Sequence, residues 1–135
     1  AVRDLMTDRP RSVEAETPLK DAALTMTRAG VAGLPVVAPD GRVIGMLGQR
    51  ELLQHLLSEY LARAGAQPGA AAPDRTRAVR DVMTRQVLCV SPDQPLAEVA
   101  AMMTNKDVDR VPVVQEGRLV GLLTRGDIVR KLIGS

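Results

Sequence analysis

The chain repeats itself, and this duplication limits its possible folds more than any other feature. The hexapeptide Val-Arg-Asp-Leu-Met-Thr at residues 2–7 returns almost unchanged at residues 79–84. Leu-Pro-Val-Val at residues 34–37 likewise matches Val-Pro-Val-Val at residues 111–114, and the match resumes after a one-residue deletion in the next turn. Because a repeat of about sixty residues has only a small core of its own, we expect the two copies to pack against each other.

The hydrophobic pattern within each copy alternates between the helix and strand periods. Apolar residues at i, i+3, i+4 and i+7 from Leu19, and again from Leu96, predict one amphipathic helix per copy. Pro18 suits the first helical position of the first of these helices, with Thr17 as its capping residue. Short apolar runs around turn residues then predict a β-hairpin in each copy, at residues 34–38 with 43–47 and at 111–114 with 119–123.

A second helix, rich in leucine, isoleucine and valine, ends each copy, at residues 52–61 and 128–133. Each copy therefore runs strand, helix, strand, strand, helix. The sequence thus predicts an α+β fold in which two tandem βαββα repeats, related by a pseudo-two-fold axis, form one compact module. The Pro- and Gly-rich stretch between the copies has no periodicity and is typical of a linker. We divide the chain into a first repeat at 1–64, a linker at 65–78 and a second repeat at 79–135.

Composition excludes several classes of protein. The residues are 45% hydrophobic and 25% charged, with no apolar run of membrane-spanning length, so we expect a soluble, cytoplasmic protein. Cys89 and His55 are the only cysteine and histidine, which leaves no disulfide and too few ligands for a zinc site. The net charge of +2 comes from interleaved charges, and Tyr60 is the only aromatic residue, so nucleic-acid binding is not expected.

The second copy contains three short motifs that resemble those of the CBS family, named for cystathionine β-synthase. They occur in the order typical of the family, and each has a counterpart in the first copy. They are Val-Met-Thr at residues 82–84, Arg-Val-Pro-Val-Val at 110–114 and Gly-Leu-Leu-Thr-Arg-Gly-Asp at 121–127. The resemblance covers nearly the whole chain. It implies that the Thr and Asp of the last piece face a cleft between the repeats and hold the ribose and phosphates of adenosine ligands.

The resemblance therefore makes Thr124 and Asp127 the centre of a candidate ligand site. An ionised carboxylate can accept hydrogen bonds from both hydroxyls of one ribose, and the start of a helix favours a phosphate. Arg125 and Arg110 are candidates for contacts with anionic groups. The adenine is expected to lie against main-chain and apolar groups, namely those of Thr84, Val87, Leu88, Val111 and Pro112. Taken alone, Thr-x-x-Asp is also the pattern of a helix capping box, so a purely structural role stays open.

The first copy departs from the family pattern, because Gly48 replaces the threonine and Glu51 replaces the aspartate. We therefore expect one good site per chain and a weaker second site at Glu51, flanked by Gly33, Leu34 and Pro35. No nucleophile, base and orienting acid can be assembled, so we expect no enzymatic activity and no catalytic cofactor.

The expected function is that of a regulatory module that senses AMP, ADP, ATP, NAD or S-adenosylmethionine and acts on an unidentified partner protein. Similar repeat pairs associate into homodimers, and the leucine-rich helix gives this chain a suitable face. The alternative is a ligand-independent dimerisation or partner-binding module whose cleft is vestigial.

Overall fold

The computed structural model describes residues 1–65 and 77–134, and its first half contains two helices and three strands of the first repeat. In chain order these are β2 (Val13–Glu14), α1 (Leu19–Ala29), β3 (Gly33–Val37), β4 (Val43–Gly48) and α2 (Gln49–Ala64). The second half contains η2 (Val79–Asp81), α3 (Leu96–Lys106), β5 (Arg110–Gln115), β6 (Arg118–Thr124) and α4 (Arg125–Gly134). A short opening segment precedes them all, with η1 (Val2–Asp4) and β1 (Thr7–Asp8).

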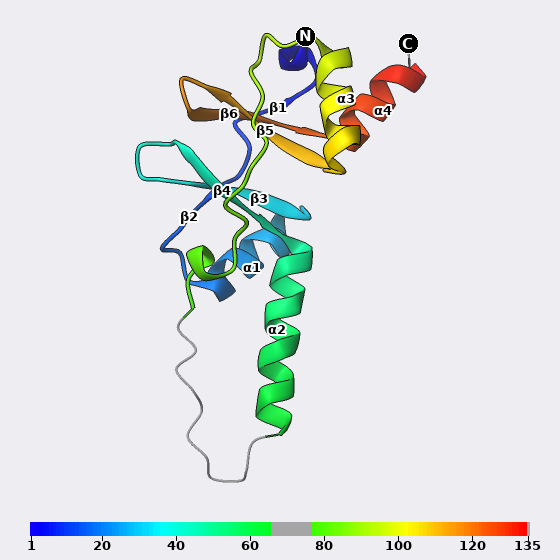
Figure 1. Ribbon diagram of the computed structural model, residues 1–135. Coiled ribbons are helices and arrows are strands. Elements are labelled where there is room, and N and C mark those ends of the chain that lie inside the picture. Colours follow the sequence, from blue (N-terminus) through cyan, green and yellow to red (C-terminus); the bar gives the residue numbers. More distant parts are fainter. Residues whose placement is uncertain (66–76, 135) are drawn as a thin grey trace.

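The strands form two three-stranded sheets, each built on the β-hairpin of one repeat. One sheet has the order β2-β3-β4 and the other the order β1-β6-β5. The hairpins β3–β4 and β5–β6 are antiparallel, and β2 lies parallel to β3. In Figure 1 the two sheets lie between the helices, with α1 and α2 beyond one sheet and α3 and α4 beyond the other. The predicted α+β fold of two tandem βαββα repeats is confirmed.

The opening segment of each copy packs on the other copy. Val2 is completely buried in the core of the second half, and its N–H donates to the Gln94 carbonyl at 3.1 Å. Strand β1 pairs antiparallel with β6, so that Thr7 lies opposite Leu122. Figure 1 accordingly shows the N-terminus beside α3. The first seven or eight residues therefore belong to the first copy in sequence and to the second half in space.

The converse exchange occurs at residues 79–84. Val79 is completely buried in the first core together with Met83, although both belong to the second copy in sequence. Thr84 and Met46 exchange two backbone hydrogen bonds, of 2.9 and 2.8 Å, which attach this segment to β4. Each repeat thus completes its core with the first residues of its partner.

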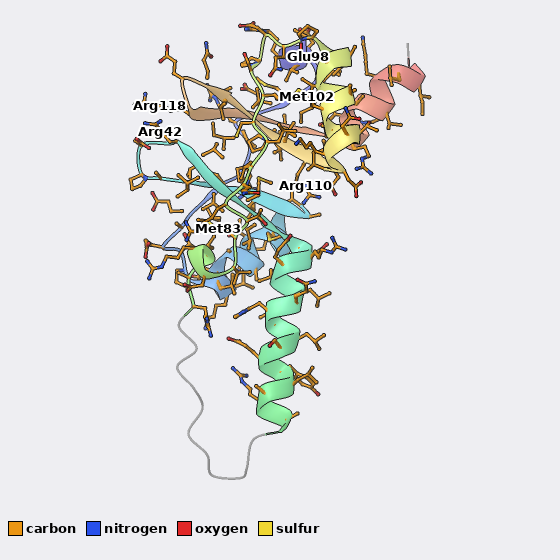
Figure 2. The ribbon with its side chains drawn as sticks, viewed as in Figure 1. Arg42, Met83, Glu98, Met102, Arg110 and Arg118 are labelled. Carbon is orange, nitrogen blue, oxygen red and sulfur yellow. The ribbon has the colours of Figure 1, made fainter. Side chains whose placement is uncertain are left out.

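Two separate hydrophobic cores result, and each fills the space between a sheet and its helices. Leu34, Val36 and Leu47 are the most buried strand residues of the first core, and Val111, Val113 and Leu123 hold the matching places in the second. Figure 2 shows Arg42 and Arg118 side by side at the hairpin turns. There Val43 N–H donates to Gly117 at 3.2 Å and Leu119 N–H donates to Gly41 at 3.0 Å, which joins the repeats symmetrically.

Two local predictions need comment. Pro18 is the N-cap residue of α1 and not its first helical residue, and no side chain caps this helix. The ψ of Pro18 is 136°, which is not helical, and the N–H of Leu19 donates to the Arg77 carbonyl at 2.8 Å. The Thr17 carbonyl accepts a hydrogen bond from the Val79 N–H at 2.9 Å, so Thr17 contacts the exchanged segment. The predicted linker at 65–78 lies mostly outside the described residues. Among the helices of residues 1–65 and 77–134, none has the length and apolar content needed to cross a bilayer.

Candidate ligand-binding site

A cavity of about 550 Å³ opens where the two repeats meet. Both halves of the chain line it: Ala32, Met46 and residues 48–51 from the first, and Thr84, residues 86–88, residues 107–110 and Arg125 from the second. Its volume is within the range of small-molecule sites, which is about 300–1,000 Å³. The cavity is therefore large enough for a nucleoside or nucleotide.

The first-repeat motif lies on the wall of this cavity. Gly48 ends β4 and caps α2, and Glu51 lies in the first turn of that helix. The Glu51 side chain folds back over Gly48, and a β-carbon at position 48 would overlap its Oε2 atom. Within the described residues the Glu51 carboxylate has no hydrogen-bond or ion-pair partner. A partly buried carboxylate is thus left available at the cavity.

The Thr124 and Asp127 side chains of the second repeat form hydrogen bonds within the first turn of their own helix. The Thr124 N–H donates to Asp127 Oδ2 at 2.9 Å, and the Asp127 N–H donates to Thr124 Oγ1 at 3.2 Å. These reciprocal bonds are a capping box at the start of α4. Arg130 adds a bond from its Nη2 to Asp127 Oδ1 at 2.5 Å. Thr124 and Asp127 are not among the residues that line the cavity.

The structure groups the predicted adenine-contacting segment differently from the sequence analysis. Thr84, Val87 and Leu88 line the cavity together with Glu51, whereas we had expected them beside Asp127. The exchange of opening segments is the physical reason, because the Met46–Thr84 pairing places residues 84–88 against the first-repeat motif. The matching segment for the second motif is the one that begins at Thr7, opposite Leu122.

Two predicted arginines lie on the cavity wall, and each is already held by neighbouring oxygens. Arg110 Nη1 donates to the Ala32 carbonyl at 2.9 Å and its Nη2 to Asp109 at 3.3 Å. Arg125 Nη2 donates to the Val108 carbonyl at 3.2 Å and lies 3.6 Å from Asp107 Oδ1. In Figure 2 Arg110 lies at the junction of the two halves. These arginines are therefore positioned for an anion but partly neutralised.

The predicted apolar contacts of the adenine lie elsewhere. Four of the predicted residues are buried within the β-hairpins and do not line the cavity: Leu34, Pro35, Val111 and Pro112. Gly33 is also buried, and the Arg110 side chain packs against it. A β-carbon at position 33 would overlap that side chain. The Val-Pro-Val-Val strand is thus a core element, and a ligand would lie near its start rather than along it.

Several cavity residues were not predicted from the sequence. They are Ala32, Met46, Gln49, Arg50, Gln86, Asp107, Val108 and Asp109. The acidic Asp107-Val108-Asp109 tripeptide, directly before the Arg110 strand, was the one feature of the sequence that could have pointed to these residues.

Away from the cavity, burial raises the pKa of the half-buried Cys89 thiol, which makes it less reactive. Across residues 1–65 and 77–134, no cluster of three or more His, Cys, Asp or Glu side chains could bind a metal ion.

This arrangement defines a class of protein: a tandem pair of βαββα repeats that interlock through their first segments and enclose a ligand-sized cavity. The sequence profile of the CBS domain matches residues 2–58 and 79–134. The chain belongs to the CBS domain family.

Proteins similar to this chain include both short and long chains. Hypoxic response protein 1 of Mycobacterium tuberculosis (strain CDC 1551 / Oshkosh) is 32% identical over 96% of this chain and 83% of its own length. The uncharacterized protein MJ1225 of Methanocaldococcus jannaschii is 29% identical over 99% of this chain, which spans only 43% of that protein. A crystal structure of CBSX2 in complex with AMP is 28% identical, with a TM-score of 0.79 over 98% of this chain and 96% of that one.

Proposed function

We propose that this chain is a non-catalytic regulatory module that binds an adenosine-containing ligand between its two repeats. The observation that carries the proposal is the cavity of about 550 Å³ whose wall comes from both halves of the chain. A ligand that fills it touches both repeats, so binding can favour one relative arrangement of the repeats over another. The similarity to CBSX2, whose crystal structure contains AMP, supports the adenosine class of ligand.

The chemistry of the cavity suits a nucleoside. The unpaired Glu51 carboxylate can accept hydrogen bonds from the 2′- and 3′-hydroxyls of one ribose. Val87, Leu88 and Met46 provide an apolar wall for the adenine ring, and the main chain near Thr84 can bond to its polar edge. Arg110 and Arg125 can contact an anionic group once they exchange part of their present bonds.

A second, symmetry-related site is proposed at Thr124 and Asp127, beside the segment that begins at Thr7. Asp127 would bind a ribose only after Arg130 releases its Oδ1 atom. Because the Arg130 side chain is 73% exposed, this exchange costs little. The first-repeat site is open without any such change, so we expect it to be filled first.

Calorimetric titration of the purified chain with AMP, ADP, ATP, NAD and S-adenosylmethionine tests the proposal. Saturable binding of at least one of these ligands is expected, and 2′-deoxyadenosine monophosphate should bind more weakly than AMP. Glu51→Ala should weaken binding at the first site about ten- to hundredfold, because hydrogen bonds to a charged group are lost. Asp127→Ala is the matched variant and should affect the second site alone.

The absence of binding by every member of this panel would refute the regulatory proposal. It would favour the alternative of an assembly module with a vestigial cleft. Apolar side chains exposed on two helices support this second candidate: Leu53, Leu56, Leu57, Tyr60 and Leu61 on α2, and Val129, Leu132 and Ile133 on α4. We propose that these faces mediate a homodimer, which is compatible with either function and leaves the regulated partner protein to be identified.

A further inference from the structure

Two pairs of residues mark the ends of the pseudo-two-fold axis, because equivalent residues that contact each other must lie on either side of it. Arg42 and Arg118 are equivalent and pair as an isolated bridge at the hairpin turns. Gly33 and Arg110 are also equivalent, each the first residue of its hairpin, and the Arg110 side chain packs on Gly33. Figure 2 shows Arg42 and Arg118 at one end of the sheets and Arg110 at the other.

The hairpin-turn end of the axis is held by backbone atoms. Val43 N–H donates to the Gly117 carbonyl at 3.2 Å, and Leu119 N–H donates to the Gly41 carbonyl at 3.0 Å. The two bonds are equivalent, and neither depends on a side chain. Residues at the ends of strands and in turns are those that absorb the backbone rotation when two bodies close on each other. This end has the properties of a hinge.

The opposite end of the axis is held by a side chain. Arg110 Nη1 donates to the Ala32 carbonyl at 2.9 Å, and Asp109 holds the same guanidinium through Nη2 at 3.3 Å. In residues 1–65 and 77–134, no second hydrogen bond joins the two repeats at this end. The Arg110 side chain is 20% exposed, so water can replace the bond. One charge-assisted hydrogen bond therefore keeps this end closed.

The two repeats differ at this contact. The dipeptide Asp109-Arg110 of the second repeat corresponds to Ala32-Gly33 of the first. A β-carbon at position 33 would overlap Arg110 Nη1, so the glycine provides the space that the arginine occupies. Arginines at both positions would bring like charges together and compete for the same space. The contact is therefore one-sided, with a charged pair on the second repeat and a small receiving pair on the first.

This contact is part of the cavity wall, since Ala32, Asp109 and Arg110 all line the cavity. The Ala32 carbonyl also accepts the Gln49 N–H at 2.8 Å, at the start of the helix that carries Glu51. Arg110 thus ties the beginning of α2 to the second repeat. Residues 9–12 and 85–89 also cross between the cores, but they have no regular secondary structure and tether the cores without fixing their angle.

We infer that the two repeats open and close about a hinge at the hairpin turns, and that the contact of Arg110 with Ala32 and Gly33 is the latch that holds them closed. Release of the latch separates Ala32 from Asp109 and widens the cavity, while the two backbone bonds of the turns remain. The inference extends the proposed function by naming the contact that controls the cavity. The motion itself is a property of the free chain and needs no ligand.

Double electron–electron resonance on the full chain tests this inference, because it measures the distance distribution between two nitroxide labels. One label pair, Arg28→Cys with Asn105→Cys, replaces equivalent exposed residues near the ends of α1 and α3, on the latch side. The other pair, Pro39→Cys with Gln115→Cys, replaces exposed residues beside the hairpin turns. Both pairs are built on Cys89→Ala. Labelled chains are diluted with unlabelled chains so that distances between copies do not contribute.

Arg110→Met keeps an unbranched side chain and removes the donors. It should raise the ratio of open to closed molecules about tenfold, which lengthens and broadens the distance between labels 28 and 105. The distance between labels 39 and 115 should not change. Gly33→Ala displaces the arginine from its place and should have the same effect, so it keeps the inference testable if Arg110→Met does not fold. Arg118→Met is the matched control at the hinge end and should change neither distance.

An unchanged distribution for labels 28 and 105 in both latch variants would overturn the inference. Broadening at labels 39 and 115 to the same extent would also overturn it, because the repeats would then separate as a whole rather than rotate about the turns. These distances are measured without ligand, so they leave the proposed function to be decided by the titrations alone.

Discussion

Substituting Val2 by alanine tests the exchange of opening segments. Val2 belongs to the first copy in sequence, yet its side chain is completely buried in the core of the second half. Removing two methyl groups loses about 1.6 kcal/mol of transfer free energy, at roughly 0.8 kcal/mol for each. The unfilled space adds about 1 kcal/mol, because backbone bonds from residues 2 and 3 hold the segment in place. We therefore expect Val2→Ala to lower the free energy of unfolding by about 2–3 kcal/mol.

The location of this loss is more informative than its size. Native-state hydrogen exchange, read by mass spectrometry, should show faster exchange in β5, β6 and α3 of the Val2→Ala variant. Val79→Ala is the matched control, because Val79 is equally buried in the first core and should speed exchange in β3, β4 and α1. Faster exchange in β3 and β4 of Val2→Ala, with β5 and β6 still protected, would refute the exchanged packing.

Two further predictions follow from close contacts and exposed surfaces. Gly45→Ala should destabilise the fold by about 2–3 kcal/mol, because the new β-carbon would lie 2.9 Å from the Thr84 backbone oxygen. Gly121→Ala should cost less, because the three atoms nearest to its new β-carbon all belong to the flexible Met6 side chain. Thermal unfolding that ranks the two variants in the opposite order would contradict this reasoning. Leu57 lies on the exposed face of α2, and Leu57→Glu should convert the proposed homodimer into a monomer without loss of helix content. Light scattering measures the oligomeric state and circular dichroism the helix content. A wild type that is monomeric at all concentrations would exclude the homodimer.

The sequence was sufficient for the elements whose determinants are local. The hairpins at Leu34 and Val111 and the helices that begin near Leu19 and Leu96 follow from periodicity and turn residues, and their duplication predicted the paired architecture. The capping box at Thr124 was also readable, since it depends on a spacing of three residues.

The grouping of residues around the cavity could not be predicted, because it depends on contacts between distant segments. Thr84 pairs with Met46 rather than with its own repeat, and nothing in either stretch specifies that partner. Val111 and Pro112 were expected to contact a ligand because they carry the family resemblance, but that pattern also describes a fully buried strand. Periodicity identifies which residues are buried and does not identify the surface against which they pack.

The exchanged segments explain how a ligand in this cavity could alter the whole module. The stretch at residues 84–88 forms one wall, and its two ends are fixed in different cores. Val79, just before it, is buried in the first core, while Val90, just after it, forms backbone bonds of 3.0 and 2.8 Å with Pro112 and Val114 in the second. Residues 84–88 therefore connect the two cores, so a ligand bound against them would contact a segment that is attached to both. The change it can produce is limited to the difference between its affinities for the two arrangements, so a ligand that binds both arrangements equally well would shift neither, however tightly it binds.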